Sequence, residues 1–295
     1  MRSIGLLVGV VCISSSVFAQ ASKHFRVEQG KNYNTVTLKY TTSSGVCYLG
    51  QGESRDPVSV YSVRDIDDFN HSFDKKEKNG QLEVNISLQE KNNETFSQSI
   101  SNKMFAEARP EDNIWKVLLT DDIAYNLDLA YGIGTAYLDL AGLSIKNLYV
   151  KTGSADVNID YLSSMPNAVT MDTMAIKVDL GNVTVRRINH ANVQNILAEV
   201  GFGNMLLDLS EPLDEPCRVR ASVGAGSLEI MIPKDKIPIL IRVKESMLCD
   251  VRLTRSFHEL TDNVYTNMEV DDDSDNMLEF DVDVSFGSII FKEKK

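Results

Sequence analysis

Four aspartates are the side chains of this sequence whose spacing could support a reaction. Asp139, Asp156, Asp160 and Asp208 fall on the polar positions of segments in which polar and apolar residues alternate. Some β-solenoid enzymes cleave polysaccharides with paired carboxylates on such a strand face. Alternation itself makes every second residue polar, so solvated strand surface is the simpler explanation. The aspartates therefore support one alternative, a carbohydrate-active enzyme, and we assign no catalytic residue.

The other reactive residue types lack the spacing of a known site. The sequence contains no C-x-x-C pair, no H-E-x-x-H, no G-x-S-x-G and no phosphate-binding loop. Residues 271–275, DDDSD, resemble part of a calcium loop but lack its glycine and its terminal glutamate, so a charged turn is expected there. We expect no metal site and no cofactor. The histidines are scattered, at His24, His71, His190 and His258.

Three cysteines lie beyond the N-terminal segment: Cys47, Cys217 and Cys249. An odd number allows at most one internal disulfide, for which Cys217 and Cys249 are the nearest pair. The alternative is that all three are small buried apolar side chains. Both alternatives remain open at this point.

A repeated glycine dominates the chain after Trp115. Apolar and polar residues alternate there in short runs, as in half-buried strands. At each glycine the phase of the alternation changes: the apolar positions are odd before Gly134 and even after it. A one-residue slip is tolerated only if the chain bends, so each glycine predicts a corner between two strands that share one core. The pairs are Gly134-Thr135, Gly153-Ser154, Gly181-Asn182, Gly203-Asn204, Gly226-Ser227 and Gly287-Ser288.

The spacing of these glycines indicates stacked coils. They lie 19, 28, 22, 23 and 61 residues apart, and intervals of about 20 to 50 residues are typical of solenoids. The long last interval leaves room for one or two coils around residues 236–266, without a recognisable corner glycine. An antiparallel sandwich with glycine bulges is the alternative.

Three of these segments carry a family resemblance: residues 125–140 (YNLDLAYGIGTAYLDL), 151–160 (KTGSADVNID) and 199–209 (EVGFGNMLLDL). They resemble the toast-rack β-repeat families of bacterial envelope proteins, which include the outer domain of LiaF-type cell-wall-stress proteins and adhesin-like proteins. The resemblance covers residues 121–292. It implies an all-β, β-solenoid-like stack of short strands with glycine corners and, by analogy, a sensing, scaffolding or adhesive role.

The region before the repeats has fewer alternating segments and more polar stretches than the repeats. Residues 36–40 and 82–88 alternate like strands, and Gly45 fits a degenerate seventh corner. Polar stretches at residues 65–79 and 90–102 predict long surface loops. We therefore expect a signal peptide over residues 1–21, an N-terminal β region with long polar loops over 22–116, and a repetitive domain over 117–295.

The first residues predict export. A positive start, a short apolar run and an A-x-A site form a secretory signal, with cleavage after Ala21 or, as second choice, Ala19. No later segment is long and apolar enough to cross a bilayer, and the net charge of −12 disfavours nucleic acid. The prediction is a non-catalytic protein of the periplasm or cell surface that presents a repeated β surface to an envelope protein or a glycan.

Overall fold

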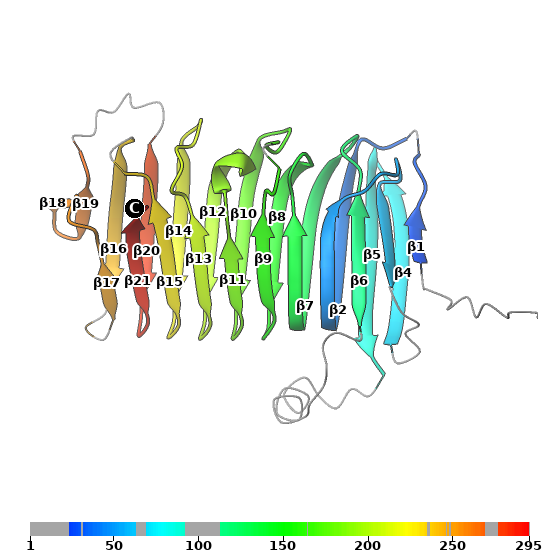
Figure 1. Ribbon diagram of the computed structural model, residues 1–295, viewed down its shortest axis with the longest axis horizontal. Helices are drawn as coiled ribbons and strands as arrows, with labels where there is room; N and C mark the ends of the chain where they lie inside the picture. Colours follow the sequence, from blue (N-terminus) through cyan, green and yellow to red (C-terminus); the bar gives the residue numbers. More distant parts are fainter. Residues whose placement is uncertain are drawn as a thin grey trace, which may run out of the picture.

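The chain forms a long stack of β-strands, seen in a computed structural model (Figure 1). In the described part of the chain, every regular element is a β-strand except η2, a 3-10 turn at Ile188–Ala191. The strands lie side by side in two series, named here face A and face B. The described residues are 24–30, 32–62, 69–91, 113–163, 165–234, 237–245, 247, 249–268 and 277–294.

Face A begins with an antiparallel strand, continues with parallel strands, and ends in an antiparallel hairpin. The first half of a long strand, β2, and of another, β7, belongs to this face. In spatial order its strands are β4 (Phe69–Lys78), β5 (Gln81–Glu90), β2 (Thr35–Gln51), β7 (Ala124–Asp139), β8 (Ser144–Thr152), β10 (Met171–Val178), β12 (Val193–Val200), β14 (Cys217–Val223), β20 (Leu278–Val284), β16 (Ile239–Glu245), β19 (Val264–Thr266) and β18 (His258–Thr261).

Face B contains the strand that follows each corner. The second halves of β2 and β7 belong to it, because both strands continue through their corner. In spatial order its strands are β1 (His24–Val27), β3 (Val58–Ser62), β6 (Ile114–Leu119), β2, β7, β9 (Asp156–Asp160), β11 (Asn182–Val185), β13 (Asn204–Asp208), β15 (Ser227–Ile232), β21 (Ser288–Glu293) and β17 (Asp250–Arg252).

The predicted corners are confirmed. The solenoid-like stack is confirmed too, and the alternative of an antiparallel sandwich is wrong, because neighbouring coils pair in parallel and in register. Gly45 is also a corner, because it lies beside Gly134, and both have positive φ, 111° and 117°. The later corners require glycine for another reason. A Cβ on Gly203 would lie 2.1 Å from the carbonyl oxygen of Gly181 in the preceding coil. Close stacking of the coils therefore excludes a side chain there.

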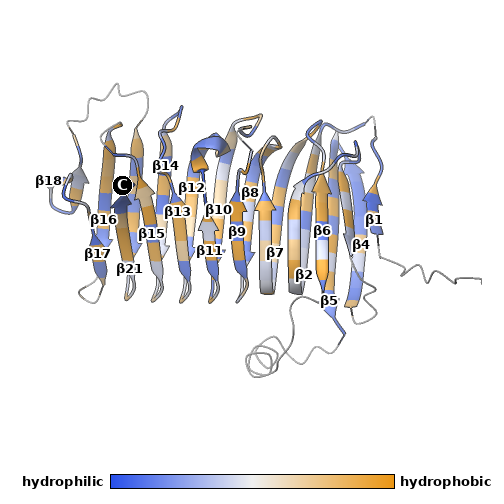
Figure 2. Ribbon diagram, viewed as in Figure 1, coloured by the Kyte–Doolittle hydropathy of each residue, from blue (hydrophilic) through white to orange (hydrophobic). Residues whose placement is uncertain are grey.

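The core lies between the two faces. Apolar side chains from both faces form one continuous buried cluster along the stack, as the alternation predicts. Figure 2 shows the resulting apolar and polar bands along the strands. Outward positions of successive strands therefore align in rows across each face.

The order of strands in the stack departs from the order in the chain at both ends. β2 lies between β7 and the later strands β5 and β6. Near the other end, β20 and β21 lie between the coil of β14 and β15 and the coil of β16 and β17. The latter coil occupies the long interval between Gly226 and Gly287, where one or two coils were expected.

The loop predicted at residues 65–79 is wrong where the chain is described, because Phe69–Lys78 form β4. This strand is the edge of face A beside β5. Its charged residues disguise it, as charges suit an exposed sheet edge. The predicted loop at 90–102 lies largely outside the described residues, as does the DDDSD turn. The domain division at residue 116 stays a prediction, and β2 from the N-terminal side pairs along its length with β7.

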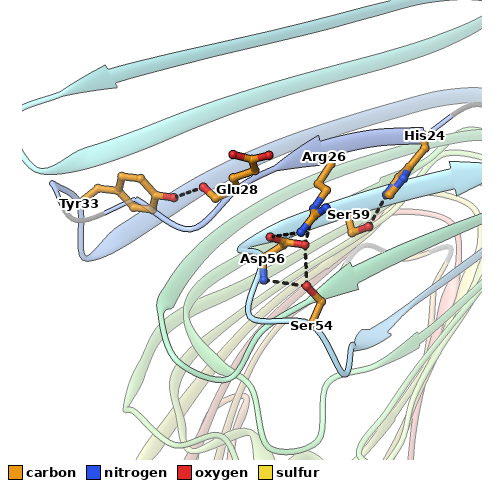
Figure 3. A network of polar contacts seen from close by, with 7 residues as sticks. All are labelled: His24, Arg26, Glu28, Tyr33, Ser54, Asp56 and Ser59. Atoms are coloured by element: carbon orange, nitrogen blue, oxygen red, sulfur yellow. Dashed lines mark hydrogen bonds and ion pairs between the residues drawn. The ribbon is translucent and has the colours of Figure 1, made fainter.

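Polar contacts fasten β1 to the N-terminal edge of face B (Figure 3). Arg26 donates two hydrogen bonds to Asp56, from Nε at 2.5 Å and from Nη2 at 3.1 Å. Ser54 donates to the same carboxylate at 2.6 Å, and His24 Nε2 lies 2.7 Å from Ser59 Oγ. The hydrogen bonds from Arg26 and Ser54 hold the pKa of Asp56 below its usual value.

Candidate functional site

The first residues of the strands after the corners form a polar row across face B; they follow a glycine in most coils and Ala155 before Asp156. Asn204 Nδ2 donates to Asn182 Oδ1 at 2.9 Å, and Asn182 Nδ2 donates to Asp156 Oδ1 at 2.7 Å. Further along the row, Ser288 Oγ donates to Ser227 Oγ at 3.0 Å. These side chains satisfy one another, so the row holds neighbouring coils in register. Asp156, one of the four candidate carboxylates, therefore has a structural partner.

The structure brings two of the four candidate aspartates together and separates the others. Asp139 and Asp160 are partners on the adjacent strands β7 and β9, with Cα atoms about 4.8 Å apart. Asp156 is four residues before Asp160 on the same strand, a distance of about 13 Å. Asp208 lies two strands from Asp160, with Arg186 in the row between them. Asp139 and Asp160 are thus the pair that the strand register makes direct neighbours, at the spacing of a retaining glycosidase.

Both paired carboxylates stabilise the turns that lead back to face A. Asp139 Oδ1 accepts hydrogen bonds from the backbone N–H of Ala141 at 3.3 Å and of Leu162 at 3.0 Å. Asp160 Oδ1 accepts from the N–H of Tyr161 and from Arg187 Nε, both at 2.8 Å. Within the described residues, no hydrogen bond occupies Oδ2 of either aspartate. Each carboxylate thus retains an acceptor oxygen for a ligand.

Two exposed tyrosines lie one row away from this pair. Tyr48 on β2 and Tyr137 on β7 are register partners, and their side chains remain 43% and 45% exposed. Their rings stack with centroids 5.3 Å apart and planes inclined by 15°. Exposed aromatic side chains side by side on a sheet face are typical of binding surfaces. These two tyrosines were not among the candidate residues predicted from the sequence, although aromatic residues at polar positions of the alternation were a usable signal.

A groove of about 840 Å³ runs between the tyrosines and the aspartates. Gly50 lies in it, in the same row as Asp139 and without a side chain to fill the space. We call this feature the tyrosine groove, defined by Tyr48, Gly50, Tyr137, Asp139, Asn158, Asp160 and Arg186. It combines apolar ring surface with a few polar groups, the usual composition of a ligand site.

Face A has a second groove, of about 610 Å³, around Tyr149, Leu197 and Arg220. Its charged residues pair largely with one another: Lys177 contacts Glu199, and Lys244 contacts Asp283 at 2.7 Å. The tyrosine groove therefore offers the clearer set of groups for a ligand.

The neighbouring strands of face A carry an ion-pair network. Arg242 and Arg218 both donate to Glu279, at 3.0 Å and 3.2 Å, and Arg242 also lies 3.3 Å from Asp281. Burial raises the pKa of Glu279, but the hydrogen bonds from the two arginines exceed this effect, so its pKa is lowered. This network joins the inserted strand β20 to both of its neighbours.

None of the cysteines Cys47, Cys217 and Cys249 forms a disulfide within the described residues. A disulfide between Cys217 and Cys249 is excluded by their positions, because Cys217 begins β14 whereas Cys249 follows the far end of β16, about 20 Å away along the strands. Burial raises the pKa of both Cys47 and Cys217 to about 12. Cys47 and Cys217 are therefore small buried side chains, as the alternative to a disulfide predicted.

The described part of the chain contains no group of three or more His, Cys, Asp or Glu side chains that could hold a metal ion. Among these same residues, no helix has the length and hydropathy needed to cross a bilayer. The predicted signal peptide over residues 1–21 lies outside the described residues.

Comparisons with known proteins place the chain in a family. No curated protein matches it. Among solved structures, a candidate cell adhesion protein from Clostridium sporogenes has 15% identity and a TM-score of 0.46, covering 93% of this chain and 100% of that one. A candidate lipid-binding protein from Parabacteroides distasonis has 10% identity and a TM-score of 0.31, covering 92% and 96%. The family model described as the N-terminal domain of toast_rack, DUF2154, matches residues 19–186, more than half of the sequence, and the chain therefore belongs to the toast-rack family.

Proposed function

We propose that this toast-rack protein is an exported, non-catalytic protein of the cell envelope that holds an envelope glycan or protein on its β surface. The observation that carries the proposal is the tyrosine groove, where stacked, exposed Tyr48 and Tyr137 border unused acceptor oxygens. The signal sequence over residues 1–21 supports a location in the periplasm or at the cell surface.

Several contacts support binding rather than turnover. Asp139 and Asp160 each hold a turn through Oδ1, and Asp160 is also paired with Arg187. Asp156 belongs to the structural row, and Asp208 accepts the N–H of Ser210 at 3.1 Å. Each candidate carboxylate therefore has a local structural role that explains its presence without catalysis.

The second candidate function is a carbohydrate-active enzyme, favoured by the adjacency of Asp139 and Asp160. Glycosidases that retain configuration place their two carboxyl groups about 5 Å apart. A screen for reducing ends released from envelope polysaccharides separates the two functions. Turnover that disappears in Asp139→Asn and Asp160→Asn would establish the enzyme and overturn the non-catalytic proposal.

The proposal is tested by expressing the full chain in a bacterial host. We expect mass spectrometry to find cleavage after Ala21, and fractionation to recover the protein outside the cytoplasm. The purified protein should sediment with washed envelope fragments, and the double variant Tyr48→Ala/Tyr137→Ala should not.

The matched control is Tyr149→Ala, which removes a 38% exposed tyrosine from face A. It should sediment like the unaltered protein. Retention of the protein in the cytoplasm, or absence of envelope binding by the unaltered chain, would contradict the proposed function.

A further inference from the structure

The ring faces of the two tyrosines are not equivalent. Because Tyr48 and Tyr137 stack on each other, each covers one face of its partner. The other face of Tyr137 lies toward β9, where its register partner is the short side chain of Asn158, followed on β11 by Thr184. An apolar ring face therefore borders a low, polar strip of the sheet. Such a face can cover the apolar side of a ring-shaped ligand while the strip bonds to its polar edge.

Gly50 leaves space open in the groove, although the packing of the strands does not require a glycine at this position. A Cβ there would lie 3.5 Å from the carbonyl oxygen of Asp139 and 3.8 Å from its Cβ, which are ordinary contacts. The corner glycine Gly203 differs, since a Cβ there would overlap a backbone oxygen. The absence of a side chain at Gly50 thus maintains open space beside the tyrosines.

The charges around the groove select against ions. Asp139 and Asp160 would repel an anion, whereas Arg186 and Lys116 would repel a cation. A neutral ligand rich in hydroxyl groups suits the whole set, because hydroxyls donate to carboxylates and accept from guanidinium, ammonium and amide groups. The donors and acceptors lie in rows that cross the strands, so the ligand lies across the strands too.

We infer that the tyrosine groove binds a neutral glycan, with one sugar ring against the free face of Tyr137 and hydroxyls bonded to Asp139, Asp160 and Arg186. This inference rests on the proposed function and names the class of its ligand. A pyranose ring has an apolar face of C–H groups and a polar edge of hydroxyls, which matches the ring face and polar strip described above.

The experiment measures binding of the processed full chain to defined probes by affinity electrophoresis and calorimetry. The neutral probes are dextran, cello-oligosaccharides and chito-oligosaccharides, and the charged controls are polygalacturonate and polylysine. We expect saturable binding to at least one neutral probe and none to the charged polymers.

Two variants test the geometry. Tyr137→Ala should weaken binding about tenfold or more, because the ring face that covers the apolar side of the sugar is lost. Gly50→Ala should weaken it severalfold with an unchanged melting temperature, because its methyl group fills the hollow without a clash. Tyr149→Ala on face A should leave the affinity unchanged.

The outcomes separate this inference from the function on which it rests. If the protein sediments with envelope fragments but binds no neutral probe, or if Tyr149→Ala weakens glycan binding as much as Tyr137→Ala, the glycan inference is overturned and a protein partner remains. If the unaltered protein neither leaves the cytoplasm nor binds envelope fragments, the proposed function itself fails. Specific neutral-glycan binding lost in Tyr137→Ala and Gly50→Ala supports both.

Discussion

Replacing Gly203 with alanine should destabilise the stack through a single methyl group. Gly203 lies at the corner between β12 and β13, directly against Gly181 of the preceding coil. A Cβ would lie 2.1 Å from the Gly181 carbonyl oxygen and 2.6 Å from Val178 Cγ1, where contacts below 3.0 Å are essentially never found. The obstacle is a neighbouring backbone, so relief requires the two coils to separate by about 1 Å.

Two costs follow from that separation. The carbonyl oxygen of Gly181 accepts the N–H of Asn204 at 3.1 Å, and losing this hydrogen bond costs about 1 kcal/mol. Overpacking a closely packed site costs about 1–3 kcal/mol more. The free energy of unfolding should therefore fall by about 2–4 kcal/mol for Gly203→Ala. For a chain of this size, the melting temperature should fall by roughly 4–16 °C.

The assay compares Gly203→Ala with Gly50→Ala, whose added Cβ has ordinary contacts. Circular dichroism follows the whole stack, and fluorescence of the single tryptophan, buried Trp115, follows the N-terminal coils. Both probes are needed because repeat proteins can unfold in parts. A melting temperature for Gly203→Ala within about 1 °C of that for Gly50→Ala would refute the argument that close coil stacking requires glycine.

Three further predictions concern charged and buried groups. Arg26→Ala should lower the melting temperature at neutral pH. The pKa of the Asp56 carboxyl is lowered in the folded protein, so its stabilising contribution is present at neutral pH and is lost as the pH falls through its folded-state pKa. Arg26→Ala should therefore also make the melting temperature depend less on pH in the acid range. Equal melting temperature profiles against pH for the two proteins would contradict this. Burial raises the pKa of Cys47 and Cys217 to about 12, so both should react with a thiol reagent at pH 8 only after denaturation. Rapid labelling of all thiols in the folded protein would contradict their burial. Glu279→Gln should cost about 1 kcal/mol in urea unfolding, because both arginines lose this carboxylate and only Arg242 keeps another, Asp281. An unchanged midpoint would show the network to be energetically neutral.

The coils could be predicted because their signal is local. Each phase change in the alternation involves a few residues around one glycine, and it can be read without knowing which strand lies next to which. The fold confirms the corners at Gly134, Gly181, Gly203 and Gly226. The physical reason at the later corners could not be read from the sequence, since the carbonyl that excludes a side chain belongs to the preceding coil.

The edge strand β4 shows why the same method fails elsewhere. Most of its residues are exposed, so no alternation of apolar and polar residues marks Phe69–Lys78 as a strand. Its lysines protect a sheet edge from pairing with another chain, and in the sequence they look like a solvated loop. Periodicity detects strands that contribute to a core, whereas this strand contributes little to it.

The tyrosine groove could not be predicted because it depends on register between distant segments. Tyr48 and Tyr137 meet only because β2 enters the stack beside β7, while β5 and β6 pair with its other side. The aspartates were identified correctly as polar face residues, but their neighbours were not. Which of them lie together was decided by the alignment of β7 with β9.

The position of the groove predicts its stoichiometry. The later coils repeat the corner and its polar row, but in the row of Tyr48 and Tyr137 they place Asn158, Thr184 and Leu206. An aromatic pair therefore occurs in this row only where β2 joins the repeats, within the described residues. Calorimetry with a short oligosaccharide should give one binding site per chain. Several equivalent sites would mean that the repeated rows, rather than the junction at β2, bind the ligand.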